Sequence, residues 1–168
     1  MVFWFTGLPC SGKTTLALSL VETLRAKNLK VEHLDGDVIR KFYPRLGFTK
    51  EARNIHIRQM TMLASILERN GIIVVASFIS PYKETRAFAR ENCQRFYEVY
   101  LNTSLEACEK RDVKGMYEKA RKGEIASFTG VDDVYEVPEN PEITINTEGR
   151  EIFDCIKEII TKSSLEFA

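Results

Sequence analysis

The sequence predicts an α/β fold: a three-layer sandwich in which helices cover both faces of a mainly parallel, five-stranded sheet. Apolar runs of strand length alternate with segments of helical spacing, which implies parallel strands joined by right-handed crossovers. A glycine-rich pattern, "GLPCSGKTT", stands between the first apolar run and the first helix. The third run, "IIVVASFI", is apolar nearly throughout, as is typical of a strand covered on both faces.

The first half of the chain contains three predicted strands and two predicted helices. "VFWFT" (2–6) is a buried strand ended by glycine, and leucines at four-residue spacing from Leu16 to Leu24 predict a helix that starts inside the loop pattern. "KVEHLDGD" (30–37) is a strand ending in a turn. The spacing from Met60 to Leu67 predicts a helix stopped by Asn70-Gly71, and "IIVVASFI" (72–79) follows as a strand.

The second half continues the alternation, with one exception. We expect a helix over 80–93 with Pro81 in its first turn, a strand over 96–101, a short helix over 104–111, a strand at "EITINT" (142–147) and a closing helix marked by Ile152, Ile156, Ile159 and Ile160. Residues 112–140 are rich in charge and glycine and have no sustained period, so this segment is functional or disordered. The chain has no repeats or linker, so we expect one domain, 1–168.

Composition excludes several classes of protein. The chain is 44% hydrophobic and 29% charged, and 24 Lys and Arg balance 24 Asp and Glu, which argues against a nucleic-acid or membrane-surface binder. No apolar run approaches the roughly 20 residues needed to span a bilayer, and "MVFWFTG" is too short for a signal peptide. The four cysteines form no CxxC pair, so we interpret them as reduced thiols of a cytoplasmic protein without a zinc site.

The first motif, "GLPCSGKTT", fits the phosphate-binding pattern G-x-x-x-x-G-K-[ST] in its expected place between strand and helix. Glycines let backbone N–H groups turn toward phosphate oxygens, and the helix N-terminus adds positive charge. Lys13 can reach the β- and γ-phosphates, and Thr14 can hold Mg²⁺. The alternative is a chance glycine turn. The loop residues expected to contact ATP are Gly7, Leu8, Pro9, Cys10, Ser11, Gly12, Lys13, Thr14 and Thr15.

Two carboxylates in "LDGDVIR" follow the second strand, on the same rim of the sheet as the loop. A carboxylate beside Mg²⁺ can orient the metal and can accept a proton from an attacking hydroxyl, so Asp35 and Asp37 are metal candidates and Asp37 a catalytic one. Asp-Gly is also an ordinary turn signal, so a simple turn remains the alternative.

Further along the chain, Arg40, Arg53 and Arg58 are candidates for holding a second anion, because guanidinium pairs well with phosphate or sulfate. Phe48 lies in polar surroundings and can offer a face to a base; taken singly, these residues also fit solvated charges and a core phenylalanine. The third strand ends near Ser80, which would face the site. The basic 112–140 segment can act as a lid that excludes water, or it is a flexible surface loop.

Together these motifs resemble the adenylylsulfate kinase family, P-loop kinases that phosphorylate the 3′-hydroxyl of adenosine 5′-phosphosulfate (APS). The resemblance spans nearly the whole chain and includes "LDGDVIR", "LGFTKEARNIHIR", "FISPY" and "KGMYEKARKGEIASFTGVDDVYEVPENPEI". It implies a P-loop NTPase-type sandwich that uses MgATP and APS, gives ADP and 3′-phosphoadenosine 5′-phosphosulfate (PAPS), and serves sulfate activation. A homodimer is expected from the resemblance alone.

The resemblance also implies roles for residues. Asp37 would contact the attacking hydroxyl and the metal site, and the adenine of APS would lie between Phe48 and Phe128. The remaining APS contacts would come from Arg40, Arg53, His56, Ile79, Ser80 and Lys114, and Arg111 and Thr147 would lie by the adenine of ATP. The family's matching serine gives Ser80 a phosphoserine-intermediate role, but we expect direct in-line transfer with Asp37 as base, which needs no relay.

Several residues depart from the family's pattern. Cys10 stands where glycine or alanine is usual, His56 replaces an asparagine that helps hold APS, and Ala52, Gln59, Val113 and Glu118 replace other usual residues. We expect His56 to affect affinity more than activity. Cys10 is small enough to be tolerated; the alternative is that the loop's positive field makes its thiol sensitive to oxidation.

Three other functions are alternatives to this one. A kinase for another small alcohol would need a different second-substrate site, which the Phe and Arg residues argue against. A regulatory module without catalysis predicts the loss of Lys13, Thr14 or Asp37, and all three are present. A domain of a larger sulfate-activating enzyme predicts a linker, and the chain ends at "SSLEFA" without one.

Overall fold

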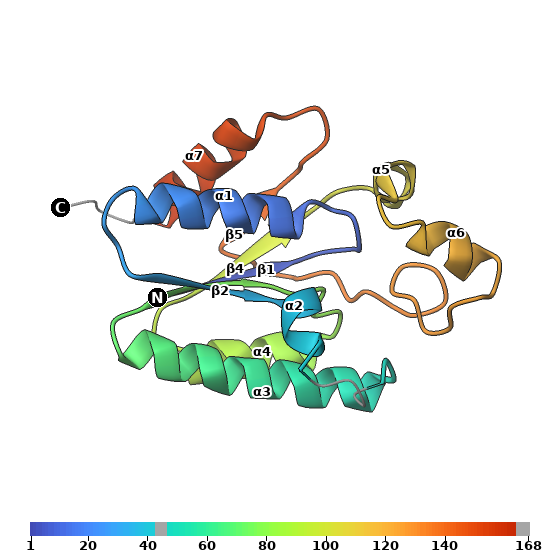
Figure 1. Cartoon of the computed structure of the whole chain (residues 1–168), viewed down its shortest axis with the longest axis horizontal. Coiled ribbons are helices and arrows are strands. Elements are labelled where there is room, and N and C mark those ends of the chain that lie inside the picture. Colours follow the sequence, from blue (N-terminus) through green and yellow to red (C-terminus); the bar gives the residue numbers. More distant parts are fainter. Residues whose placement is uncertain (43–46, 164–168) are drawn as a thin grey trace.

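The computed structural model describes residues 1–42 and 47–163, so Leu46, which opens the "LGFTKEARNIHIR" motif, and the final "SLEFA" lie outside the described residues. Its five strands form one parallel sheet, which confirms the predicted mainly parallel, five-stranded sheet, and their order in it is β2-β3-β1-β4-β5 (Figure 1). In chain order they are β1 (Val2–Thr6), β2 (Val31–Asp35), β3 (Ile73–Ser77), β4 (Phe96–Leu101) and β5 (Ile143–Ile145). The strand that feeds the phosphate loop therefore lies in the middle of the sheet.

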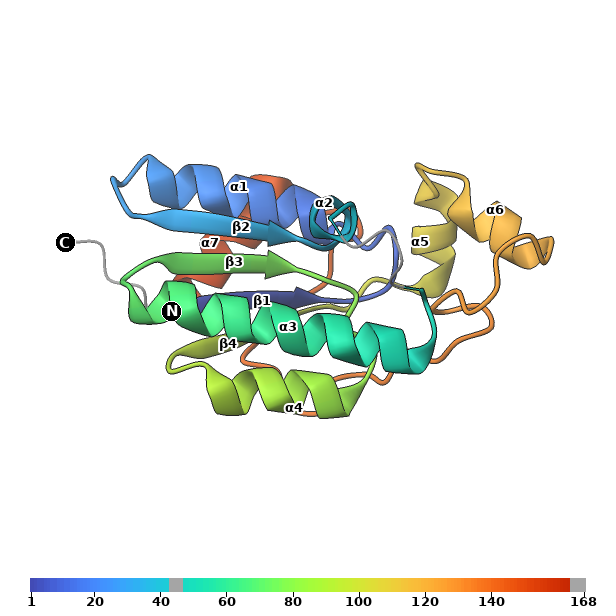
Figure 2. The same ribbon diagram turned by 60° about the horizontal axis from the view of Figure 1, so that its bottom comes forward.

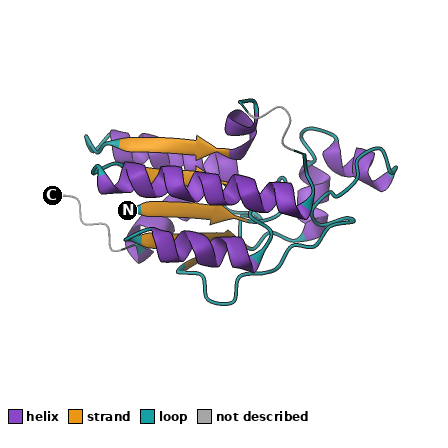
Figure 3. Cartoon of the chain, turned by 90° about the horizontal axis from the view of Figure 1, so that it is seen from below, coloured by secondary structure: helices purple, strands orange, loops and turns teal. Residues whose placement is uncertain are grey.

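Helices form the outer layers of the sandwich. One face of the sheet is covered by α1 (Lys13–Arg25) and α7 (Ile152–Lys162), and the other by α3 (Lys50–Arg69) and α4 (Lys83–Asn92) (Figures 1 and 2). Three short helices, α2 (Gly36–Arg40), α5 (Leu105–Arg111) and α6 (Met116–Arg121), lie beyond the carboxyl ends of the strands, where the arrowheads point in Figure 3. Ligand sites in such sheets form at this edge.

The two layers have separate cores because successive side chains of a strand point to opposite faces. Phe3 and Phe5 of β1 pack with Leu20 of α1 and Ile156 of α7. Trp4, between them, packs on the other face with the α3 side. A third, smaller cluster lies outside the sandwich and joins Tyr117 and Phe128 to α5 and to the phosphate loop.

Several expected boundaries are wrong: the strand expected over 142–147 is limited to Ile143–Ile145, and two further differences lie beside the pocket. The third strand ends at Ser77, not at residue 79, and α4 begins at Lys83, so Pro81 precedes the helix instead of lying in its first turn. The physical reason is Ser80, whose φ of 44° is left-handed and turns the chain sharply between strand and helix.

Two short helices, α2 and α6, were not predicted from the sequence. Asp35-Gly36 is a helix start and not only a turn, since the Asp35 carboxylate accepts the N–H groups of Asp37 and Val38 and caps α2. Within 112–140, α6 forms because Asp112 accepts three N–H groups of its first turn, from Met116, Tyr117 and Glu118. Both helices are too short for a periodic signal, so they depend on these caps and on packing.

No helix in the described part of the chain is long and apolar enough to cross a membrane.

Candidate active site

A large pocket of about 1180 Å³ opens at the carboxyl ends of the strands, between the phosphate loop, α2, α3 and the 112–140 segment. Most of the site residues predicted from the sequence line it. They are Pro9, Cys10, Gly12, Lys13, Thr14, Thr15, Asp35, Asp37, Arg40, Phe48, Arg53, His56, Ile79, Ser80, Arg111, Lys114, Phe128 and Thr147. Gly7, Leu8 and Ser11 were predicted to contact ATP but are not among its lining residues.

The phosphate loop needs backbone conformations that side chains disfavour. Gly7 has φ 153°, and a Cβ there would lie 3.0 Å from the Leu101 carbonyl oxygen. Gly12, with φ 100°, is the N-cap residue of α1. Cys10 has φ 59°, which explains why glycine suits this position, and the cysteine is accommodated because its side chain packs on the Tyr117 cluster.

Lys13, the first residue of α1, folds back over the loop. Its Nζ donates to the carbonyls of Gly7 (2.9 Å) and Leu8 (2.6 Å) and to the Ser11 hydroxyl (3.3 Å). Burial lowers the pKa of Lys13 to about 8, because the ammonium has lost water and gained only carbonyl and hydroxyl partners. Gly7, Leu8 and Ser11 thus hold the lysine over the loop, where a phosphate would offer it a stronger partner.

Asp35 is anchored on every side. Its Oδ2 accepts from the hydroxyls of Thr14 (3.0 Å) and Ser77 (3.1 Å), and its Oδ1 caps α2. Burial by itself would raise the pKa of Asp35, but the bonds from Val38 N–H, Thr14 and Ser77 outweigh it and leave the pKa below its usual value. The group is therefore ionised and fixed at neutral pH.

Thr14 and Asp35 supply the oxygen donors that Mg²⁺ prefers. Among the described residues, no group of three or more His, Cys, Asp or Glu side chains could hold a metal ion. Mg²⁺ is commonly held by one or two protein oxygens, with phosphate oxygens and water completing its ligands, and this donor pair fits that pattern.

Asp37, in the first turn of α2, has a different environment. Its side chain is 72% exposed, and its partner is the Lys114 ammonium, which reaches it from the 112–140 segment and is itself 66% exposed. The hydrogen bond that the Lys114 ammonium donates to the Asp37 carboxylate raises the pKa of Lys114. Of the two candidate carboxylates, Asp37 is the one accessible to an incoming hydroxyl group.

Two phenylalanines line the same pocket: Phe48 from the residues just before α3, and Phe128 from the 112–140 segment. Phe48 is 58% exposed, and the Arg40 guanidinium lies over its ring, 4.5 Å from the centroid. Phe128 is only 8% exposed and packs edge-on against Tyr117, with ring centroids 5.0 Å apart. One ring is therefore accessible and the other is fixed, an arrangement suited to holding a flat base.

Arg53 of α3 forms hydrogen bonds with the 112–140 segment. Its guanidinium donates to the Phe48 carbonyl (2.8 Å), the Thr129 hydroxyl (2.9 Å) and the Ser127 carbonyl (2.5 Å). The predicted anion-binding residue is thus buried and engaged with protein groups. Arg58, the remaining arginine candidate, lies over the ring of Phe88 and is not among the residues that line the pocket.

His56 is buried in α3, edge-on to the ring of Phe78. Burial, with a contribution from the charge of Arg40, lowers the pKa of His56 to about 4. The imidazole is therefore neutral at neutral pH, and it lines the pocket as a polar but uncharged group.

Ser80 and Ile79 form a tightly held turn. The Ser80 hydroxyl accepts from the Trp4 indole N–H at 3.0 Å, and the Ile79 carbonyl accepts from the Thr6 hydroxyl at 2.7 Å. At the other end of the pocket, Arg111 donates to the hydroxyl (2.8 Å) and carbonyl (3.0 Å) of Thr147. Arg111 and Thr147, predicted to lie together, are therefore in direct contact beside Gly12.

Sequence reasoning missed residues that act through tertiary contacts. The Tyr117 hydroxyl donates to the Pro9 carbonyl of the phosphate loop at 3.0 Å, and the Tyr82 hydroxyl donates to Asp133 at 2.9 Å. Arg86 of α4 donates to the Ser80 carbonyl at 2.6 Å. Their partners lie 108, 51 and 6 positions away, and no local pattern marks such pairs.

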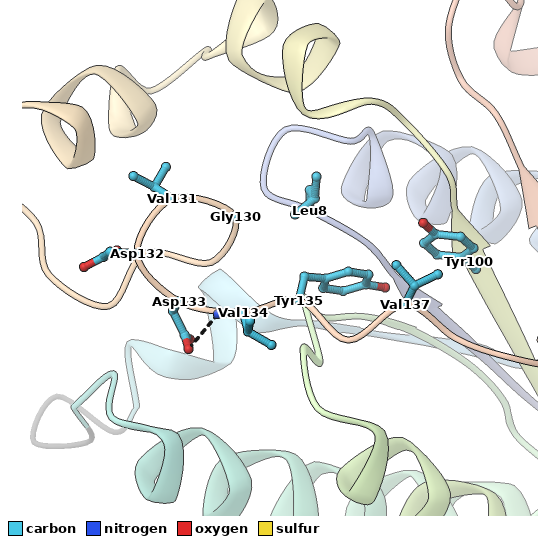
Figure 4. A pocket seen from close by; sticks show the side chains of 9 residues that line it. All are labelled: Leu8, Tyr100, Gly130, Val131, Asp132, Asp133, Val134, Tyr135 and Val137. Carbon is cyan, nitrogen blue, oxygen red and sulfur yellow. Dashed lines mark hydrogen bonds between the residues drawn. The ribbon is translucent and has the colours of Figure 1, made fainter.

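A smaller pocket of about 470 Å³ lies behind the phosphate loop, where residues 130–137 pass Leu8 and Tyr100 (Figure 4). Leu8 therefore lines this pocket and not the large one.

Comparison with known proteins points to one family. The family model described as adenylylsulphate kinase matches residues 1–146. An adenylyl-sulfate kinase of Picosynechococcus is 47% identical over 160 residues, 95% of this chain and 90% of the relative. A probable adenylyl-sulfate kinase of Pyrococcus abyssi is 53% identical over 145 residues, 86% and 83% of the two chains. An APS kinase of Mycobacterium tuberculosis, solved in complex with AMPPNP and APS, matches with TM-score 0.93 and 37% identity over 98% of this chain and 97% of that one.

Proposed function

The chain belongs to the adenylylsulphate kinase family and is an ATP-dependent kinase of APS, and we propose that its large pocket binds the two substrates side by side for direct phosphoryl transfer. The reaction phosphorylates the 3′-hydroxyl of APS and gives PAPS and ADP, a step of sulfate activation. The observation that carries the assignment of the pocket is the placement of the phosphate loop and exposed Asp37 in one cavity with Phe48 and Phe128.

In this proposal the phosphate loop binds the phosphates of ATP, and Lys13 exchanges its carbonyl partners for β- and γ-phosphate oxygens. Arg111 and Thr147 lie at the end of the pocket that receives the adenine of ATP. On the other side, the adenine of APS lies between Phe48 and Phe128. Arg40, Arg53, His56, the Ile79–Ser80 turn and Lys114 surround the rest of APS.

Asp37 is proposed as the base. The 3′-hydroxyl oxygen of APS attacks the γ-phosphorus, the bond to the β,γ-bridging oxygen breaks, and ADP leaves with that oxygen. The hydroxyl proton passes to the Asp37 carboxylate, which is exposed to the pocket. The Ser80 hydroxyl is buried and already accepts from Trp4, which supports a binding role over a phosphoserine intermediate.

Thr14 and Asp35 are the proposed holders of Mg²⁺, with Asp37 beside them. The ion, when bound with ATP, neutralises charge on the phosphate oxygens. The Thr14 hydroxyl donates to Asp35 in the structure and would be free to turn an oxygen lone pair toward such a cation.

The direct test is to mix the protein with MgATP and APS and to follow PAPS and ADP by chromatography. We expect one PAPS for each ADP, and little ADP without APS. Equal consumption of ATP with and without APS, and no PAPS, would overturn the substrate assignment. A nucleotide-binding regulatory module without catalysis would bind ATP and form neither product.

We further propose one kinase domain over residues 1–168, with the lid segment (residues 112–140) covering the pocket. Contacts of Lys114 with Asp37, of Tyr117 with Pro9 and of Arg53 with Ser127 support this. A cytoplasmic homodimer is our proposal from the resemblance to the family. Light scattering after size-exclusion chromatography tests the dimer, and a monomer at assay concentration would contradict it.

A further inference from the structure

The turn that follows β3 (residues 79–81) has three carbonyl oxygens, and each accepts a hydrogen bond from a different part of the chain. The Ile79 carbonyl accepts from Thr6 of β1 at 2.7 Å, the Ser80 carbonyl from Arg86 of α4 at 2.6 Å, and the Pro81 carbonyl from the N–H of Glu136 at 2.8 Å. Ser80 has a left-handed φ of 44°. A non-glycine residue persists in this conformation only where surrounding contacts fix it.

Arg86 contacts this turn and also residues from two other parts of the chain, Glu98 and Glu136. Its side chain is 4% exposed, and its second terminal nitrogen donates to the Glu136 carbonyl at 2.5 Å. Its Nε lies 2.8 Å from Glu98 Oε1, so the buried charge is paired. The guanidinium also lies over the ring of Tyr135, 5.7 Å from the centroid. One side chain therefore joins the 79–81 turn to the last part of the lid segment, around Glu136.

This last part of the lid segment, here called the strap (residues 130–137), runs past Leu8 of the phosphate loop. Figure 4 shows Tyr135 on the strap beside Leu8 and near Tyr100. The Tyr135 hydroxyl is 2.8 Å from the Thr6 hydroxyl, and its ring stacks on Tyr100 with centroids 6.2 Å apart. The strap is thus held against β1 and β4 on one side and against Arg86 on the other.

The geometry requires arginine. A planar guanidinium presents nitrogens in a fixed fork, so it can hold two carbonyls at a set separation and pair with a carboxylate at the same time. A lysine ammonium in the same place is a single point of charge that can keep the Glu98 pair but cannot reproduce both carbonyl contacts. Leaving a buried carbonyl without its donor is costly.

We propose that Arg86 is a positioning residue for APS: by holding the Ser80 and Glu136 carbonyls together, it sets the 79–81 turn and the strap in the relative placement that the APS side of the pocket needs. Arg86 does not touch the pocket; Ser80 does. This inference rests on the proposed placement of APS beside Ser80.

Steady-state kinetics of Arg86→Lys test the proposal. We expect KM for APS to rise about tenfold or more, as a buried carbonyl loses its donor, while KM for ATP changes little. Arg90→Lys is the matched control. Arg90 also bonds Glu98, at 3.1 Å, and lies on the same helix, but among the described residues it makes no hydrogen bond to the turn or the strap. Equal effects of the two variants on KM for APS, or equal rises of both KM values in Arg86→Lys, would overturn the proposal.

Amide hydrogen exchange gives a readout that does not depend on activity. In the ligand-free wild type, the Glu136 amide should exchange slowly. It donates a hydrogen bond to the Pro81 carbonyl, and Arg86 holds the carbonyl of the same residue, Glu136, in place. Arg86→Lys should speed this exchange and Arg90→Lys should not. Rapid exchange of the Glu136 amide in the wild type would overturn the proposal even if Arg86→Lys fails to fold.

The two measurements also separate this inference from the proposed function. Absence of PAPS formation by the wild type would be a failure of the function, and the exchange pattern would still report whether Arg86 holds the strap. Normal PAPS formation with an unchanged KM for APS in Arg86→Lys would be a failure of the positioning role alone.

Discussion

The Lys114 ammonium is hydrogen-bonded to the Asp37 carboxylate, although 77 positions separate the two residues in the chain. The contact joins the lid segment to the helix that follows β2. It places a cation against the group that we propose as the base. Phosphate groups of the substrates would compete with Asp37 for the Lys114 ammonium. Substrate binding would therefore release the Asp37 carboxylate from this contact.

Asp37→Ala should lower turnover about 100-fold or more, because it removes the proton acceptor. ATP affinity should persist, since Lys13 and the loop are intact. Turnover of PAPS formation and nucleotide binding by titration calorimetry are the measurements. Asp37→Asn keeps the shape without the charge and should be similarly impaired; near-wild-type turnover in both variants would remove Asp37 from the mechanism.

Lys114→Met should weaken APS binding more than it lowers turnover, because the lysine contacts Asp37 and reaches into the pocket without being a reacting group. We expect KM for APS to rise about tenfold, as one charge-assisted contact is lost. Lys119→Met, another lid lysine with an exposed side chain, is the control and should leave both KM values unchanged. The idea fails if the two variants behave alike.

Nucleotide affinity should fall as pH rises through about 8, the pKa to which burial lowers Lys13. Bound phosphate needs the ammonium, so above this pH binding must first return a proton, and the association constant falls up to about tenfold per pH unit. Affinity for ATP is measured between pH 7 and 10. Lys13→Met should bind weakly at every pH and lack this step; an identical pH dependence in the variant would assign the step to another group.

Peroxide should inactivate the enzyme if the positive field of the loop makes the Cys10 thiol reactive. Cys10 is the one partly exposed cysteine among four free thiols, and the other three are buried. ATP should protect the enzyme, and Cys10→Ala should be resistant. Activity after timed exposure is the readout. Unchanged sensitivity in Cys10→Ala would leave the residue as a small spacer.

Cys10→Gly addresses the backbone at the same position. Its φ of 59° is left-handed, where glycine is unstrained, so glycine should stabilise the loop by about 1 kcal/mol or less, partly offset by greater freedom of the unfolded chain. Thermal unfolding measures it. A loss of stability would show that packing of the thiol on the Tyr117 cluster outweighs the strain.

The main fold was predictable because strands and long helices carry local signals. The apolar run of β1, the leucine spacing of α1 and the four-residue pattern of α3 each follow from one face or both faces being buried. The phosphate loop and the order of its neighbours placed most of the candidate residues at one edge of the sheet. The expected family is confirmed by the match over residues 1–146.

Two of the short helices, α2 and α6, were not predictable in the same way, whereas the short helix expected over 104–111 is confirmed as α5. Helix α6 depends on Asp112 and on the packing of Tyr117 and Ala120 against Cys108, and α2 depends on the Asp35 cap. Each has fewer turns than a periodic signal needs. The placement of Pro81 before α4 follows from the left-handed Ser80, which a propensity argument does not detect.

The sequence by itself determined the sheet, the phosphate loop and the residues gathered around it, since these follow from local spacing and from the rule that parallel strands end at one edge. Tertiary structure alone decided which site side chains are fixed by hydrogen bonds to protein groups and which are exposed to the pocket. Asp35 is fixed by Thr14 and Ser77 while Asp37 is exposed, Arg53 is engaged by the lid, and Arg86 joins the Ser80 turn to the strap. The physical reason is that burial and hydrogen-bond partners come from segments distant in sequence, and these set the charge, strain and reach of each side chain.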